Sequence, residues 1–144
     1  MDIQVSRITK FEDILIKHLF EKVDEPAEPN PRFFEDEKNI MLVSRTNGAV
    51  SGFLWAFILD SPNRPFPKMF LYSIDVFEQF RHQGIATLLI RHLKDIARAH
   101  NCHKMFVPTS KNNLAAVALY RRTGGIAQND DGVSFEYDRE ALNA

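Results

Sequence analysis

An arginine, a glycine and an alanine stand at fixed spacing, as Arg81-x-x-Gly84-x-Ala86, between an apolar run and a segment with helical periodicity. The first backbone N–H groups of a helix have no partner within the helix, so an anion is favoured there. Gly84 allows close backbone approach because it has no Cβ, and Arg81 can add a charge-assisted hydrogen bond. The pattern indicates a site for a phosphate-bearing cofactor. Taken alone, a plain strand–helix connection accounts for it equally well.

A second group of residues has the spacing Asn113-x-x-Ala116-x-x-Leu119-Tyr120. On a helix, residues 113, 116 and 120 lie along one face, where the small Ala116 permits close approach of a ligand. A free phenol has a pKa near 10, so Tyr120 is protonated at neutral pH and can act as a general acid. Taken alone, this pattern favours an ordinary amphipathic helix with Tyr120 in the core.

The elements that must position these residues follow from hydrophobic periodicity and from proline and glycine. The helix over residues 84–100 has the clearest periodicity, and its expected buried stripe is Ile85, Leu88, Leu89, Leu93, Ile96 and Ala97. Asn112 is the expected N-cap of the helix over 113–122. Proline-containing loops are expected at 26–31 and 60–67, and Asn47-Gly48 is a hairpin turn signal. The remaining expectations are a helix over 11–23, strands at 3–8, 39–45, 49–59, 69–76 and 104–107, and a closing hairpin of 126–128 and 133–137 around 129–132.

Length and composition limit the class of protein. The chain has 144 residues and a net charge of −1, which suits one α/β domain and gives no support for nucleic-acid binding. Its apolar runs are too short to span a bilayer, and the single Cys102 rules out an internal disulfide framework. No secretory leader pattern is found at the N-terminus, which favours the cytoplasm. His82 and His92 lack partners at metal-ligand spacing, so no metal is expected.

The two motifs, in this order, resemble those of the GNAT superfamily of acetyl-CoA-dependent N-acetyltransferases. Arg81-x-x-Gly84-x-Ala86 is similar to that family's Gln/Arg-x-x-Gly-x-Gly/Ala loop, and Asn113-x-x-Ala116-x-x-Leu119-Tyr120 is similar to its later helix motif. The resemblance covers residues 3–137. Within the superfamily the chain looks most like the small aminoglycoside 3-N-acetyltransferases, through residues 70–76, 81–87 and 116–120.

The resemblance implies a single N-acetyltransferase domain over residues 1–144. Its mixed central sheet would be flanked by helices and splayed at the strand that ends near Val76. Acetyl-CoA would be the acetyl donor, and an amine would attack the thioester directly while the backbone N–H of Val76 stabilises the oxyanion. Tyr120 would protonate the departing thiolate. The implied donor-binding residues are Ile74, Val76, Arg81, His82, Gln83, Gly84, Ile85, Ala86, Thr87, Asn113, Ala116 and Tyr120.

Two positions depart from the aminoglycoside group. An Asp, the base of that group, is replaced here by Ser73, and Asp75 lies two residues further on the same face of a regular strand. Asp75 either takes over as general base or pairs with a basic group. The family's Gly-Phe after the tyrosine helix is Gly124-Gly125 here, a change expected to affect packing.

The amine acceptor is less clearly indicated. The segment 21–37 is rich in Asp and Glu, which can attract a polycationic amine or can be an ordinary solvated surface. Trp55 and Phe57 either line the acceptor cleft or, as we expect, pack in the core.

Three functions follow from these observations. An aminoglycoside or similar small polyamine is the expected acceptor. A protein N-terminus or lysine is the alternative. An open groove between the first helical region and residues 60–67 would favour this alternative, whereas an acidic pocket would favour the small amine. A non-catalytic acyl-CoA-binding module is the third reading, which the serine at position 73 keeps open. The resemblance also implies a homodimer.

Overall fold

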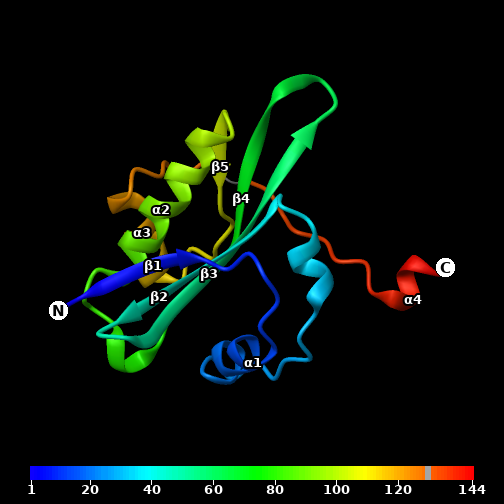
Figure 1. The fold of residues 1–144 in the computed structure, drawn as a ribbon. Helices are drawn as coiled ribbons and strands as arrows, with labels where there is room; N and C mark the ends of the chain where they lie inside the picture. Colours follow the sequence, from blue (N-terminus) through cyan, green and yellow to red (C-terminus); the bar gives the residue numbers. More distant parts are fainter. Residues whose placement is uncertain (129–130) are drawn as a thin grey trace.

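A computed structural model describes residues 1–128 and 131–144 of the chain (Figure 1). Five strands form one sheet in the order β1-β2-β3-β4-β5, antiparallel except for the parallel pair β4–β5. The mixed sheet and its flanking helices confirm the predicted α/β fold. The strands are β1 (Ile3–Arg7), β2 (Asn39–Thr46), β3 (Ala49–Ser61), β4 (Arg64–Val76) and β5 (Lys104–Phe106). The helices are α1 (Asp13–Glu21), α2 (Ile85–Ala99), α3 (Leu114–Arg122) and α4 (Arg139–Leu142), with 3-10 turns η1 (Pro31–Glu35) and η2 (Glu78–Phe80).

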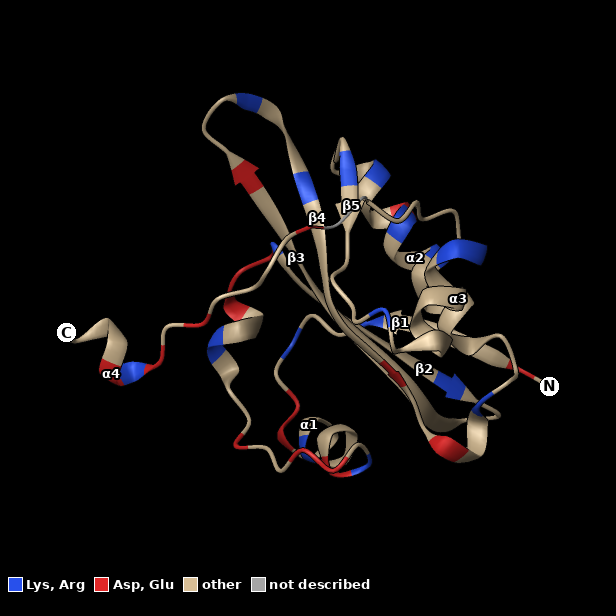
Figure 2. Cartoon of the chain, turned by 180° about the vertical axis from the view of Figure 1, so that it is seen from behind, with Lys and Arg blue, Asp and Glu red and all other residues tan. Residues whose placement is uncertain are grey.

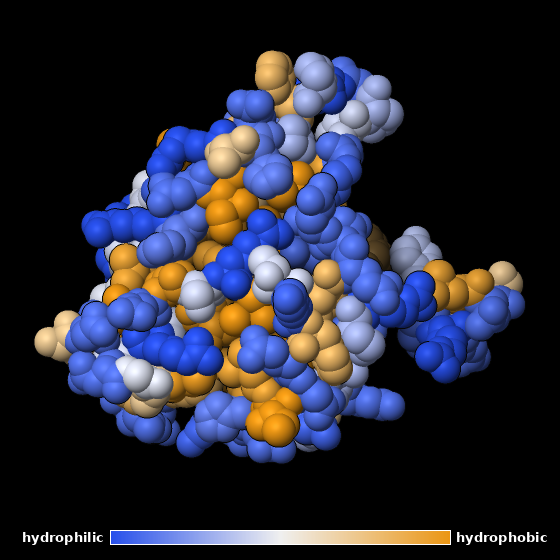
Figure 3. Space-filling model, viewed as in Figure 1, coloured by the Kyte–Doolittle hydropathy of each residue, from blue (hydrophilic) through white to orange (hydrophobic). Residues whose placement is uncertain are grey.

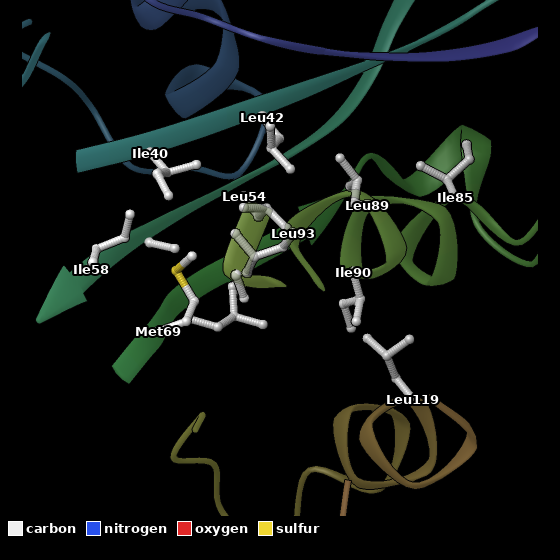
Figure 4. Close-up of a cluster of buried hydrophobic side chains, with 13 residues drawn as sticks. Ile40, Leu42, Leu54, Ile58, Met69, Ile85, Leu89, Ile90, Leu93 and Leu119 are labelled. Atoms are coloured by element: carbon white, nitrogen blue, oxygen red, sulfur yellow. The ribbon is translucent and has the colours of Figure 1, made fainter. Parts of the chain in front are cut away.

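The sheet has a hydrophobic core on each face. On one face, Leu54 and Leu71 pack with Leu89 and Leu93 of α2, and the labelled side chains of this core converge in Figure 4. On the other face, a second core around Phe53 includes residues of α1. Full burial of a side chain such as Leu contributes about 1.5–3 kcal/mol. These two cores hold α1 and α2 against opposite faces of the same strands.

Helix α2 confirms the predicted amphipathic pattern, with one shift of its buried stripe. Ile85, Leu89, Leu93 and Ala97 are buried as expected, and Ile90 is buried with them. Of the other predicted positions, Leu88 and Ile96 are half-buried. No helix within the described ranges is long and apolar enough to cross a membrane.

The sheet opens between β4 and β5. In the described part of the chain, β5 pairs with β4 only from Lys68 to Phe70. Beyond Phe70, strand β4 continues to Val76 with β3 as its partner. The splay predicted for the strand ending near Val76 is therefore present.

A β-bulge in β4 decides which side chains face which core. Ala56 pairs with Leu71 and Trp55 pairs with Ser73, so Tyr72 is an extra residue in the ladder. An extra residue reverses the inward–outward alternation of everything after it. As a result Ile74 and Val76 pack on the α2 side, and Ser73 and Asp75 lie on the α1 side with Trp55.

The loop predicted for residues 60–67 is wrong. Strands β3 and β4 extend into a long hairpin in which Ser61 pairs with Arg64. The carbonyl of Pro67 accepts a hydrogen bond from the N–H of His103, on the β5 side, at 3.0 Å. The ring nitrogen of Pro67 therefore also faces away from β3, so this proline removes no hydrogen bond from the β3–β4 ladder.

The predicted closing hairpin is also wrong. The described residues of that segment, 126–128 and 131–138, form no strand, and the segment with α4 stands away from the body of the molecule (Figures 1 and 3). The predicted turn includes residues 129 and 130, which lie outside the described residues. Val133, Phe135 and Tyr137 alternate as a strand pattern requires, but they are 77%, 79% and 72% exposed. Alternation alone makes no strand without a neighbouring edge to receive the backbone hydrogen bonds.

Candidate active site

In the described part of the chain, the edge of β4 beyond Phe70 faces no neighbouring strand. The N–H of Phe77 donates to the carbonyl of Ser51 in β3 at 2.9 Å. Successive residues of a strand point their backbone groups to opposite edges, so the N–H and C=O of Val76 and Ile74 face the opening. The carbonyl of Val76 there accepts a hydrogen bond from Nε of Arg81 at 3.2 Å. An extended ligand that carries amide groups can pair with such an edge.

The start of α2 lies next in the chain after this edge. Gly84 is the N-cap with φ +80°, and no side chain caps the helix. A Cβ added to Gly84 would meet no atom within 4 Å, so the space in front of the helix is open. Residues 81–84 are exposed, and His82 also has a left-handed backbone, with φ +63°. This arrangement suits an anion held by the first N–H groups of the helix.

Helix α3 brings the second motif to the same side. The cap of the helix is Asn113 rather than the predicted Asn112, because Oδ1 of Asn113 accepts the N–H of Ala116 at 3.1 Å. The N–H of Asn112 instead donates to Oγ of Ser110, at 3.2 Å. Ala116 and Tyr120 are half-buried on the face that meets the α2-side core.

A hydrogen bond connects the two helices that carry the motifs. Nε of Arg122, at the end of α3, donates to Oγ1 of Thr87 in the first turn of α2, at 3.3 Å. This bond places a guanidinium group beside the start of α2.

Asp75 and Ser73 share a strand face, as expected. Oγ of Ser73 donates to Oδ2 of Asp75 at 3.5 Å. Burial is the main cause that raises the pKa of Asp75, and the charge of Glu25 raises it further. The hydrogen bond from Ser73 and the charge of Arg81 offset part of this rise in pKa. A carboxyl group with a raised pKa beside an open site is a candidate general base.

Tyr120 lies within the electrostatic field of Asp75. Burial, followed by the charge of Asp75, raises the pKa of the Tyr120 phenol above its ordinary value. The phenol therefore keeps its proton throughout the neutral range. One site thus contains a carboxyl group with a raised pKa and a protonated phenol.

A cavity of about 350 Å³ lies on the α1 side of the sheet. Trp55 lines it, whereas Phe57 packs in an aromatic cluster with Phe33, Trp55 and Phe70. Red acidic segments lie along α1 and the chain that follows it (Figure 2). The lining residues are Ile16, Phe20, Glu25, Pro26, Ala27, Glu28, Pro29, Asn30, Phe33, Phe34, Met41 and Trp55.

Two residues that shape this region were not predicted from the sequence. Glu25 appeared there only as one member of an acidic segment. Gly52 was not considered, although a Cβ at this position would lie 2.8 Å from the carbonyl oxygen of Asp75 and 3.3 Å from Cα of Val76. A glycine inside a strand pattern is the signal that could have indicated this close approach.

The fold and the open edge of β4 together define an α/β domain with an open mixed sheet and a helix N-terminus beside the opening. The profile of the acetyltransferase (GNAT) family matches residues 9–125. The chain belongs to this family, and the protein is an N-acetyltransferase enzyme.

Known proteins of similar sequence and structure agree with this family. The uncharacterized N-acetyltransferase YdgE of Bacillus subtilis (strain 168) is 30% identical over 111 residues, which are 75% of this chain and 69% of that protein. The structure of an aminoglycoside acetyltransferase, HMB0005, from an uncultured soil metagenomic sample has a TM-score of 0.76 and 26% identity over 93% of this chain and 100% of that chain. The aminoglycoside N-acetyltransferase AAC(6')-Iy, in complex with the bisubstrate analog CoA-S-monomethyl-acetylneamine, has a TM-score of 0.78 and 21% identity over 96% of this chain and 99% of that chain. At 21% identity the similarity shows the fold alone.

Proposed function

We propose that this chain transfers the acetyl group of acetyl-CoA to a small primary amine by direct attack, without an acyl-enzyme. The opening between β4 and β5 beyond Phe70, next to the exposed start of α2, is the observation that carries the proposal. It offers an unpaired strand edge for the amide groups of pantetheine and helix N–H groups for the pyrophosphate. The acetyl group would then lie near Asp75 and Tyr120.

The donor site consists of three parts. The backbone of Ile74 and Val76 pairs with pantetheine, and Asn113 and Ala116 on α3 approach it from the other side. Tyr120 lies nearest the sulfur. The loop and first helical turn that hold the pyrophosphate are Arg81, His82, Gln83, Gly84, Ile85, Ala86 and Thr87.

The reaction then needs two proton transfers. The neutral amine attacks the thioester carbonyl carbon, a C–N bond forms, and the N–H of Val76 stabilises the charge on the oxygen. Asp75 takes the proton that the nitrogen loses. The C–S bond breaks, and Tyr120 donates its proton to the leaving thiolate of CoA. Proton exchange with solvent restores Asp75 and Tyr120.

For the acceptor, we propose a small amine, and the resemblance to known families suggests the aminoglycoside or polyamine type. The solved relatives named above support this class, as does the cavity with Glu25 and Glu28 in its lining. The alternative, a protein N-terminus or lysine, was tied to an open groove between the first helical region and residues 60–67. A pocket with acidic residues favours the small amine instead, and Glu25 and Glu28 line the cavity beside α1. The reading as a non-catalytic acyl-CoA-binding module rests on Ser73 and is weakened by the raised pKa of Asp75.

The proposal also includes the setting of the reaction. Residues 1–144 would act as one N-acetyltransferase domain, without a metal, in the cytoplasm. The protein would form a homodimer.

Two measurements test this function. Calorimetry with acetyl-CoA should show saturable binding, and an assay of CoA release should show turnover with at least one amine of a panel of aminoglycosides, polyamines and peptides. Absence of acetyl-CoA binding would contradict the proposal in every form. Binding without turnover across the panel would favour the non-catalytic module, and turnover of peptides alone would favour the protein acetyltransferase.

A further inference from the structure

The cavity on the α1 side has two chemically different walls. Phe33, Phe34 and Trp55 form an aromatic wall, and Ile16 and Met41, both buried, add apolar surface. The polar side chains in the lining are those of Glu25, Glu28 and Asn30. The described lining residues thus include two carboxylates and no lysine or arginine. The cavity favours a cation that also carries an apolar surface.

The aromatic wall is fixed by packing. The ring centroid of Trp55 lies 6.1 Å from that of Phe33, in an edge-to-face arrangement, and 4.2 Å from the ring centroid of Tyr72. The ring centroids of Phe33 and Phe34 lie 5.0 Å apart, and these two rings also meet edge to face. Such contacts restrict the rings, so a flat or apolar ligand meets a preformed surface.

Glu25 connects this cavity to the reacting groups. It lines the cavity, and its charge acts on Asp75. Its backbone N–H donates to the carbonyl of Phe20 at 2.9 Å, which holds the segment against the end of α1. Trp55 pairs in register with Ser73, whose hydroxyl contacts Asp75. The cavity therefore lies on the same face of the sheet as the carboxyl group proposed as base, with Trp55 and Ser73 between them.

We infer that the acceptor is a compact primary amine with an apolar, preferably aromatic, carbon skeleton, whose ring packs on Trp55 while Glu25 attracts its ammonium group. This inference rests on the proposed acetyl transfer to a small primary amine. Within that class it favours an apolar amine over the aminoglycoside or polyamine type that the resemblance implies. A cation close to a carboxylate and to an aromatic face is stabilised by both. Solvent takes one proton from the ammonium group, and the neutral nitrogen attacks the thioester. Asp75 accepts the second proton, which the nitrogen loses as the C–N bond forms.

The same surface disfavours an aminoglycoside. A polyhydroxylated molecule brings many donors and acceptors, and each one that is buried without a partner costs about 1–3 kcal/mol. The side chains of Glu25, Glu28 and Asn30 can satisfy few of them. A volume of about 350 Å³ is also at the low end of the range for ligand pockets, about 300–1,000 Å³.

Trp55 provides a direct test, because it is the only tryptophan in the sequence. Its fluorescence therefore reports on the cavity without any need for turnover. We expect 2-phenylethylamine to change the Trp55 emission saturably, and kanamycin and spermidine to bind at least tenfold more weakly. Saturable binding of kanamycin that is as tight as that of 2-phenylethylamine would overturn the inference.

Matched variants separate specific binding from a general effect of acidity. Glu25→Gln should raise the dissociation constant for 2-phenylethylamine about tenfold or more, whereas Glu35→Gln, outside the cavity lining, should leave it unchanged. Equal effects of the two variants, or none, would overturn the assigned role of Glu25. The affinity for acetyl-CoA should stay within twofold of wild type in both variants.

Turnover distinguishes failure of this inference from failure of the proposed function. The inference expects kcat/KM for 2-phenylethylamine to exceed that for kanamycin. If kanamycin is the better substrate, the inference fails and the acetyltransferase proposal stands. If acetyl-CoA does not bind at all, the proposed function fails, and the inference fails with it even when the Trp55 signal is present.

Discussion

Asp75 and Tyr120 have pKa values that are raised for related reasons and that suit opposite roles. Both groups are partly buried, and Tyr120 additionally lies in the field of Asp75. The carboxyl group gains affinity for a proton, as a base requires, and the phenol retains its proton, as an acid requires. Each side chain therefore has a consequence that kinetics can measure.

The pH dependence of kcat/KM should identify Asp75. A base acts when deprotonated, so its raised pKa places the acidic limb of the profile above the range of an ordinary carboxyl group. Ser73→Ala should move this limb to higher pH, because the hydrogen bond from Ser73 lowers the pKa. Glu25→Gln should move it to lower pH, because the charge of Glu25 raises the pKa. A limb that stays in place in both variants would assign it to another group.

Tyr120→Phe should lower kcat by about 100-fold, the lower end of the range for general acid catalysis. The affinity for acetyl-CoA, measured by calorimetry, should change less than twofold because the ring remains. Tyr137→Phe is the control, since Tyr137 is 72% exposed in the C-terminal segment. Full activity of Tyr120→Phe would show that another group protonates the thiolate.

At the scale of elements, the bulge in β4 and the start of α2 produce the site together. The bulge at Tyr72 turns Ser73 and Asp75 to the α1 side and leaves Ile74 and Val76 on the α2 side. The strand then leads through η2 to Gly84, where the helix begins. An open strand edge and an exposed helix N-terminus follow each other within a few residues.

Two glycines provide a matched test of the helix start. Gly84 and Gly48 both have positive φ, +80° and +86°, and an added Cβ meets no atom within 4 Å at either position. Each change to Ala should therefore cost about 1 kcal/mol of folding stability from backbone strain. Gly84→Ala alone should raise the dissociation constant for acetyl-CoA, by about tenfold or more, because the methyl group enters the space in front of the helix. Equal affinity in the two variants would place the pyrophosphate elsewhere.

Individual elements show how far the sequence could be interpreted. The stripe of α2 was predictable because an amphipathic helix records its buried face locally. The hairpin over residues 60–67 was not predictable from the sequence. A proline fits a strand only where its nitrogen faces away from the partner strand, as that of Pro67 does, and only the structure shows this orientation. Asn112 and Asn113 are both good N-caps by residue type. The structure selects Asn113, because its Oδ1 accepts the N–H of Ala116.

At the scale of the whole molecule, two cores on opposite faces of the sheet place the donor and acceptor sides. The α2-side core supports the helix start, and the α1-side core supports the cavity. Figure 3 shows apolar side chains (orange) reaching the surface of the molecule between polar ones. Asp75 lies half-buried on the α1 side of the sheet, so its charge affects folding stability as well as chemistry.

The stability of the whole protein should therefore depend on pH through Asp75. Its pKa is raised in the folded state, so its stabilising contribution is present below the ordinary carboxyl pKa, near 3.9, and is lost as the pH rises through the folded-state pKa. Asp75→Asn should accordingly raise Tm at pH 7, and the difference from wild type should vanish near pH 3.5. Asp95→Asn, at an exposed carboxylate paired with Arg98, should show no such gain. A lower Tm for Asp75→Asn at pH 7 would contradict this assignment.

The sequence by itself determined the two motifs, the helix that carries the first of them and the class of ligand they suit. These features are local, because a glycine, a cap or a helical stripe acts on residues within a few positions. Only the tertiary structure decided that Glu25 acts on Asp75, that Trp55 lines a cavity and that Gly52 lies against the backbone of Asp75. These relations join segments that are distant in the chain, and they depend on the register of β3 with β4 and on one extra residue at Tyr72. A one-residue change of register reverses every side chain that follows it, and no local pattern records that choice.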